Sequence, residues 1–158
     1  MITQETIDLL WQSTQQWKSP APALQKTLTF AEAYRVQLGV LARWQAAGEK
    51  LGGWKIGASA EGARKALGLD APISGYLLAS RAFPSGHTFS HTALQRPIIE
   101  SELCFTIGSR LAGPGVTKAQ VLDAVSAVAP AFEVVDMRLD MRADMPLGIA
   151  DDVAQWGY

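Results

Sequence analysis

Two glutamates stand two residues apart in the segment that most strongly predicts a β-strand, residues 96–107. Successive side chains of a strand point to opposite faces, so Glu100 and Glu102 share one face at a separation of roughly 6–7 Å. Carboxylates this close repel each other, and a hard divalent cation, which prefers oxygen ligands, removes that repulsion. The pattern indicates a metal site, although two solvated glutamates on a half-exposed strand fit the same alternation.

A third acidic residue, Glu133, lies among apolar residues in a second predicted strand, residues 131–138. Burying a carboxylate is costly unless a cation or hydrogen-bond donors compensate for the lost water. A third carboxylate beside the first two would complete a ligand set and leave coordination positions for substrate and water. The alternative is an ion pair with an arginine such as Arg96 or Arg138.

Lys55 lies between glycines in a short predicted strand, residues 52–57. Its ammonium group could bind a substrate carboxylate or assist proton transfer. The alternative is an edge lysine in water. His87 and His91 are spaced to align two metal ligands only on a helix, whereas the neighbouring proline and glycine predict a loop. The sequence therefore favours an oxygen-ligand site over a zinc site.

The elements that must position these residues follow from apolar periodicity and from breaker residues. A helical pattern covers residues 3–17, with Thr3 as N-cap, and residues 29–48, with Thr29 as N-cap. The other expected elements are a helix at 60–67, a strand within 72–83, a helix at 117–128 capped by Thr117, and an apolar segment at 147–154.

This order predicts an α+β fold. A helical N-terminal segment, residues 1–50, precedes a mixed β region, residues 51–158, which carries the candidate site. The face of strand 96–107 opposite the glutamates is apolar and is predicted to belong to the core. It comprises Ile99, Leu103, Phe105 and Ile107.

Composition excludes several classes of partner. The 158 residues suit one domain, and the net charge of −1 with a pI near 6.1 offers no basic surface for nucleic acid or anionic membranes. The single cysteine, Cys104, cannot form an intrachain disulfide, which favours a reducing compartment. Because neither a signal peptide nor a membrane-spanning apolar run is evident, we expect a cytoplasmic protein.

Several segments resemble those of one family in their order and spacing. They are residues 33–37 (AYRVQ), 52–57 (GGWKIG), 67–72 (LGLDAP), 75–77 (GYL), 100–102 (ESE) and 130–136 (PAFEVVD). Together they are similar to the family of 2-keto-4-pentenoate hydratase and 4-oxalocrotonate decarboxylase, which is related to fumarylacetoacetate hydrolase. The resemblance covers nearly the whole chain from about residue 29 onward.

The resemblance implies a fumarylacetoacetase-like mixed β-roll or barrel fronted by the N-terminal helices. Glu100, Glu102 and Glu133 match the three metal-binding glutamates of the family, which usually hold Mg²⁺ or Mn²⁺. Lys55 matches the site lysine and is the predicted catalytic residue; Lys55 and Ser59 are the predicted substrate-binding residues. Such enzymes bind a small 2-oxo acid on the ion, which polarises the carbonyl and stabilises an enolate.

The chain departs from the family pattern at two places. Ile73 stands where hydratases typically carry an aspartate that acts in proton transfer, and Asp70 is out of register with that place. Family members continue with further strands where this sequence stops at Tyr158, which predicts an incomplete barrel.

The resemblance implies a divalent-metal-dependent lyase, either a hydratase or a decarboxylase, acting on a 2-oxo or 2-hydroxy-dienoic acid of aromatic catabolism. Ile73 keeps open an acylpyruvate-type hydrolase that cleaves a C–C bond on the same metal. A third alternative is a catalytically silent homologue that serves as a partner subunit. We expect a homo-oligomer or a complex with a related subunit, and no nucleic-acid or membrane partner.

Overall fold

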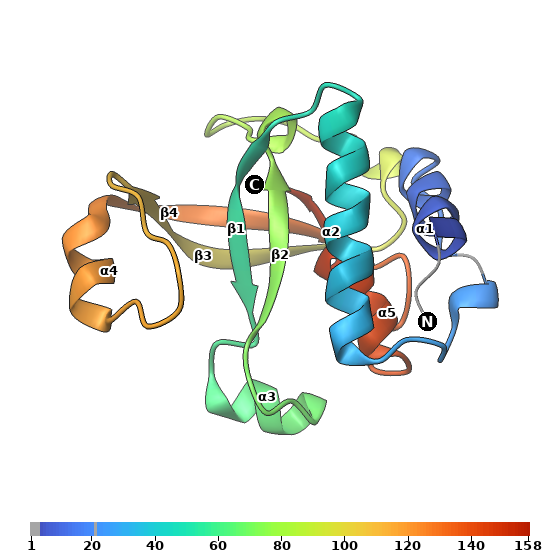
Figure 1. The fold of residues 1–158 in the computed structure, drawn as a ribbon. Coiled ribbons are helices and arrows are strands. Elements are labelled where there is room, and N and C mark those ends of the chain that lie inside the picture. The colour runs from blue at the N-terminus through green and yellow to red at the C-terminus, as the bar shows by residue number, and fades with distance from the viewer. Residues whose placement is uncertain (1–3, 21) are drawn as a thin grey trace.

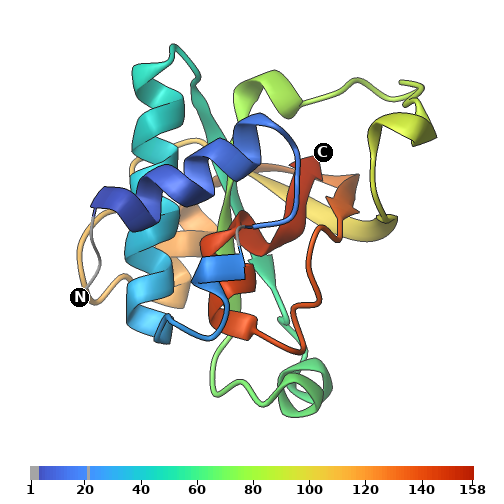
Figure 2. The same cartoon turned by 90° about the vertical axis from the view of Figure 1, so that its right-hand side faces the viewer.

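Two helices form the N-terminal part of the computed structural model, which describes residues 4–20 and 22–158. Helix α1 (Gln4–Gln15) packs against α2 (Phe30–Ala46), with a short 3-10 turn, Pro22–Leu24, between them in the chain (Figures 1 and 2). As predicted, Thr29 caps α2: its hydroxyl accepts from the Glu32 N–H, and the Glu32 carboxylate accepts from the Thr29 N–H. The proposed N-cap Thr3 lies outside the described residues.

The first strands form an antiparallel hairpin. Strand β1 (Leu51–Gly57) pairs with β2 (Ile73–Leu78), and their connection holds α3 (Glu61–Leu67). Helix α3 ends at Gly68, which adopts a left-handed φ of 67°. Glycine accepts this conformation without the steric cost of a side chain, so it ends the helix as the sequence predicted.

A second antiparallel sheet contains the longest strands. Strand β3 (Pro97–Ile107) pairs with β4 (Val125–Asp136), and the end of β4 also pairs with β5 (Gln155–Gly157). In Figure 1 the long β3–β4 ribbon runs crosswise to the β1–β2 hairpin and carries α4 (Lys118–Ala124) at its far end. Short 3-10 turns occur at Ala79–Arg81, His91–Ala93 and Asp152–Ala154.

The core lies where α1, α2 and β2 meet α5 (Met145–Ala150). Its fully or nearly fully buried side chains include Leu10, Val36, Val40, Ile73, Leu147 and Ile149. Gln37 is buried among them, and its Nε2 donates to the carbonyls of Ser74 (3.0 Å) and Ile149 (2.7 Å). One satisfied polar group thus ties α2 to both β2 and α5. The predicted α+β class is confirmed.

No helix within residues 4–20 or 22–158 has the length and apolar character needed to cross a membrane.

The helix predicted at 117–128 is shorter than expected, and the strand that follows it is longer. Helix α4 ends at Ala124, and β4 begins at Val125 instead of residue 131. Strand β4 pairs with β3 along its whole length, so the hydrogen bonds of β3 hold the additional residues in the strand. Pro130, opposite Leu103, is tolerated because the pairing of β5 with β4 lies further along the strand.

The apolar side of β3 is exposed, which corrects the prediction that it belongs to the core. Its predicted core residues are 49% to 63% exposed, and two residues of β4 extend the same side. We call this set the ribbon face: Ile99, Leu103, Phe105, Ile107, Val128 and Phe132. Alternation determines which side chains share a face, but burial requires a covering element, and α1, α2 and α5 pack on one another and on Ile73 of β2 instead.

Candidate metal centre

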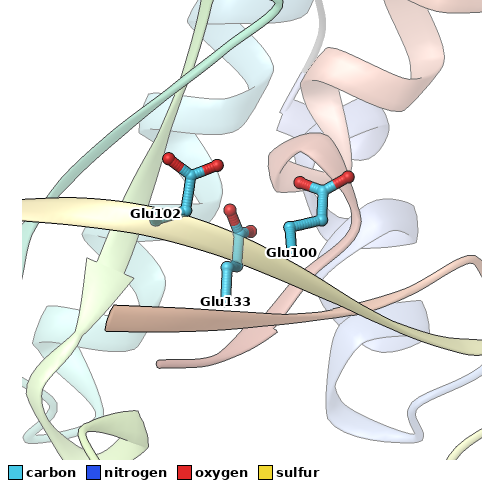
Figure 3. Close-up of side chains that lie close together, drawn as sticks. All are labelled: Glu100, Glu102 and Glu133. Atoms are coloured by element: carbon cyan, nitrogen blue, oxygen red, sulfur yellow. The ribbon is translucent and has the colours of Figure 1, made fainter. Parts of the chain in front are cut away.

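The pairing of β3 with β4 brings three glutamates together. Glu100 and Glu133 are direct partners in the antiparallel register, so their side chains share one face, and Glu102 is two residues further along that face. One carboxylate oxygen from each lies within 4.8 Å of the other two. Figure 3 shows the three side chains converging above the strands. The shared face predicted for Glu100 and Glu102 is therefore present, and Glu133 lies beside them.

The spacing of these oxygens fits a hard divalent cation. Ligand oxygens on opposite sides of an ion lie about 4.8 Å apart for Ca²⁺ and about 4.2 Å apart for Mg²⁺. Glu100 and Glu102 are exposed, so their side chains can rotate to shorten the distances, whereas Glu133 is buried. Among the described residues, these glutamates are the one group of three or more acidic, histidine or cysteine side chains close enough to hold a metal ion.

Lys55 completes the electrostatics of the centre. Its side chain is 9% exposed, and its Nζ donates to Glu133 Oε1 and to the carbonyl of Val153 at 3.1 Å. Burial raises the pKa of Glu133 above its ordinary value; Lys55 opposes this rise, and the charges of Glu100 and Glu102 add to it. Three carboxylates beside one ammonium leave two negative charges, which is the charge that a divalent cation neutralises.

Two alternatives from the sequence are wrong. Lys55 is not an edge lysine in water, because it is buried against Glu133. Glu133 does not pair with an arginine: it accepts from Lys55, and Arg138 donates to Asp151 Oδ1 in a separate buried ion pair.

The segment that follows α5 was missed by sequence reasoning. Asp152 is 6% exposed, and its Oδ1 accepts from the backbone N–H of Tyr76 at 2.7 Å. Burial raises the pKa of Asp152 well above its ordinary value, although the Tyr76 N–H and Lys55 oppose this. Burial likewise raises the pKa of Asp151 to about 7 despite Arg138, which lowers it. The available signal was two adjacent aspartates in an apolar segment, since buried acids require partners.

The remaining candidates lie in different surroundings. Ser59 is exposed in the loop after β1, where its carbonyl accepts from Arg64 Nη1; its role in substrate binding stays a prediction. His87 stacks on Phe83 with ring centroids 4.5 Å apart, in an aromatic cluster that also contains Phe89 and Trp156. Ile73, which replaces the expected aspartate, is buried in the core.

Known proteins that are similar in sequence to this chain include a hydratase and a decarboxylase, both longer than it. No family model matches the chain. It is 35% identical over 156 residues to 2-hydroxypent-2,4-dienoate hydratase of Pseudomonas putida, covering 97% of this chain and 69% of that protein. It is 34% identical over 128 residues to 4-oxalocrotonate decarboxylase of Pseudomonas sp. (strain CF600), covering 80% of this chain and 48% of that protein.

Solved structures show the same fold. Two structures of 4-oxalocrotonate decarboxylase from Pseudomonas putida G7, one with calcium and acetate and one with magnesium and adipate, match with TM-scores of 0.88 and 0.89. Both are 27% identical and cover 99% of this chain, while the chain spans 62% of theirs.

The fold and the glutamates define an α+β protein with a carboxylate cluster beside a buried lysine. More specifically, the chain belongs to the family of 2-keto-4-pentenoate hydratases and 4-oxalocrotonate decarboxylases. It spans about half to two thirds of the length of these relatives.

Proposed function

We propose that this chain binds Mg²⁺ or Mn²⁺ through Glu100, Glu102 and Glu133 and acts as a lyase on a small 2-oxo or 2-hydroxy-dienoic acid of aromatic catabolism. The observation that carries the proposal is the convergence of three carboxylates beside a buried lysine. Relatives named as a dienoate hydratase and as 4-oxalocrotonate decarboxylase support the substrate class, and the magnesium and adipate in a solved relative support both metal and acid.

The side chains present have distinct tasks in this proposal. A bound divalent ion supplies Lewis acidity for polarising a substrate carbonyl. Glu100 and Glu102 are exposed, so the metal position between them is accessible to a substrate that enters from solvent. Lys55 is the catalytic candidate: its ammonium can attract the substrate carboxylate and transfer a proton at the neighbouring carbon. Ser59 is proposed to bind the substrate as well.

In this proposal the site belongs to the mixed β region, residues 51–158, and the helical segment, residues 1–50, supports it. We place the protein in the cytoplasm, without a nucleic-acid or membrane partner.

A second candidate reaction is hydrolysis of a C–C bond in an acylpyruvate-type substrate. The observation that favours it is Ile73, which is 5% exposed and packs in the core where the resemblance implies a proton-transferring aspartate. Without that carboxyl group, addition of water to a double bond lacks one of its acid–base groups. Incubation with 2-hydroxypenta-2,4-dienoate, 4-oxalocrotonate and an acylpyruvate, followed by ultraviolet absorbance and product mass, distinguishes hydratase, decarboxylase and hydrolase.

We also propose association through the ribbon face. An apolar surface of this extent on one side of a sheet is typical of an interaction site. A second copy of this chain is the proposed occupant, and a related enzyme subunit is the alternative, in which case this chain could serve as a silent partner. Light scattering on the purified chain should show a dimer or larger assembly; a monomer would count against a second copy.

Metal binding is the direct test of the proposal. Calorimetric titration with Mg²⁺ and then Mn²⁺ should show saturable binding, and oxalate, which resembles a 2-oxo acid, should bind only when the metal is present. A protein that binds neither ion would overturn the proposed function.

A further inference from the structure

A left-handed turn lies directly behind Lys55. The consecutive residues Asp152, Val153 and Ala154 have φ values of 58°, 55° and 58°. Residues other than glycine, asparagine and aspartate rarely adopt this backbone conformation, and a β-branched valine is particularly unfavourable there. Such a turn persists only when surrounding contacts hold it, and residues in strained conformations often lie at functional sites.

Asp152 supplies a contact that holds the turn. Its buried Oδ1 accepts from the Tyr76 N–H at 2.7 Å, so the turn is bonded to the backbone of β2. Gly75 permits this close approach, because a Cβ at that position would lie 2.8 Å from Asp152 Oδ1 and 3.1 Å from the Asp152 carbonyl oxygen. Burial raises the pKa of Asp152, while the hydrogen bond from the Tyr76 N–H opposes this rise.

The turn presents a backbone carbonyl to Lys55. The Val153 oxygen accepts from Lys55 Nζ at 3.1 Å, while Glu133 Oε1 accepts from the same ammonium. In the proposed metal centre, the Glu133 carboxylate must serve an ion as well as Lys55. The Val153 carbonyl has no such second task, and it can therefore keep the ammonium in place when the glutamates are engaged.

We propose that Asp152 is a positioning residue for Lys55: its hydrogen bond to Tyr76 fixes the left-handed turn, and the Val153 carbonyl of that turn holds the Lys55 ammonium at the glutamates. This deepens the proposed function and rests on it for the role of Lys55. The contacts themselves belong to the fold and can be tested separately from metal binding.

Two substitutions separate the hydrogen bond from the backbone conformation. Asp152→Asn keeps an acceptor oxygen, and Asp152→Gly removes it; both residues accept a left-handed φ. The reaction rate of Lys55 with acetic anhydride, followed by peptide mass spectrometry, reports how well Lys55 is held. The exposed Lys65 is the internal reference. Urea midpoints and Mn²⁺ affinities are measured on the same proteins.

In Asp152→Gly, Lys55 should react about five- to tenfold faster than in the native chain, because one hydrogen bond that holds the turn is lost. Asp152→Asn should stay within about twofold of the native rate. Unchanged labelling in Asp152→Gly, or labelling that rises only as far as its lost stability predicts, would overturn the proposal. Fast labelling of Lys55 in Asp152→Asn would also overturn the proposal. If Asp152→Gly does not fold, the labelling rate in Asp152→Asn is the test of the proposal.

Mn²⁺ affinity distinguishes this proposal from the proposed function. If the native chain binds no Mn²⁺, the metal-dependent function fails, while Lys55 labelling still decides whether Asp152 positions the lysine. If Mn²⁺ binds equally to all three proteins and Asp152→Gly alone releases Lys55, both proposals are supported.

Discussion

The core around α2 and the β3–β4 ribbon contain the same kinds of apolar residue but differ in how much of each reaches solvent. Ile149 of α5 is 0% exposed, whereas Leu103 of β3 is 63% exposed. The difference arises because α1, α2 and α5 pack on one another and on Ile73 of β2, while the ribbon face lacks a comparable cover among the described residues. The folding free energy of this chain therefore comes mainly from the core, and the ribbon face contributes little to it.

Truncating a buried apolar side chain of the core should cost far more stability than truncating an exposed one on the ribbon face. Ile149→Ala should lower the free energy of unfolding by about 2–5 kcal/mol, because it removes buried methyl groups and leaves a cavity. The matched variant Leu103→Ala should change it by about 0.5 kcal/mol or less, as for other exposed positions. Urea denaturation measures both. If the two variants lose similar stability, the ribbon face is covered in solution.

The pH dependence of stability should come from acids buried around the turn after α5. The pKa of Asp151 is about 7 in the folded chain, against an ordinary value of 3.8. The folded state then binds its proton more tightly, so this stabilisation is complete below about pH 4 and is lost as the pH rises to about 7. The raised pKa values of Asp152 and Glu133 act in the same direction. We expect a loss on the order of a few kcal/mol.

Urea titrations between about pH 4.5 and 8, with a chelator present, measure this slope. Asp151→Asn cannot release a proton and should flatten it. A slope that is the same in both proteins would show that Asp151 ionises at its ordinary pKa beside Arg138.

The side of β3 and β4 that carries the glutamates lies opposite the ribbon face, and substitutions there should change metal affinity. Glu102→Gln should weaken Mn²⁺ binding at least about tenfold, or 1.4 kcal/mol, because an amide oxygen is a weaker ligand than a carboxylate. The fold should be retained, since Glu102 is exposed. Glu61→Gln is the control: Glu61 is an exposed acid of α3 paired with Lys65. Electron paramagnetic resonance of free Mn²⁺ gives both affinities, and equal values would remove Glu102 from the site.

Two helix caps of the same design should differ by a small amount in how much stability they contribute. Thr29 caps α2 beside the core, and Thr117 caps α4 at the far end of the ribbon; each forms a capping box with the residue three positions later. Thr29→Ala should cost about 1 kcal/mol of global stability. Thr117→Ala should cost less, because the short α4 can fray without exposing the core. Equal losses in thermal denaturation would indicate that the ribbon and core unfold as one unit.

Much of the candidate site was predictable. The positions of Glu100 and Glu102 within an alternating strand placed both on one face, and the isolated Glu133 among apolar residues required a partner. The pairing of Lys55 with Glu133 was not predictable, since these residues are far apart in sequence and lie in different sheets. The end of α4 was also missed, because β4 is extended by its pairing with β3 and not by a local signal.

Features that depend on neighbouring residues can be read from the amino-acid sequence alone. Thr29 begins α2, Gly68 ends α3, and strand alternation assigns Glu100 and Glu102 to one face; each follows from local backbone geometry. The remaining features depend on the three-dimensional fold. The register that sets Glu133 opposite Glu100, the turn that brings Val153 to Lys55, and the exposure of the ribbon face all depend on contacts between distant segments, which no local pattern encodes.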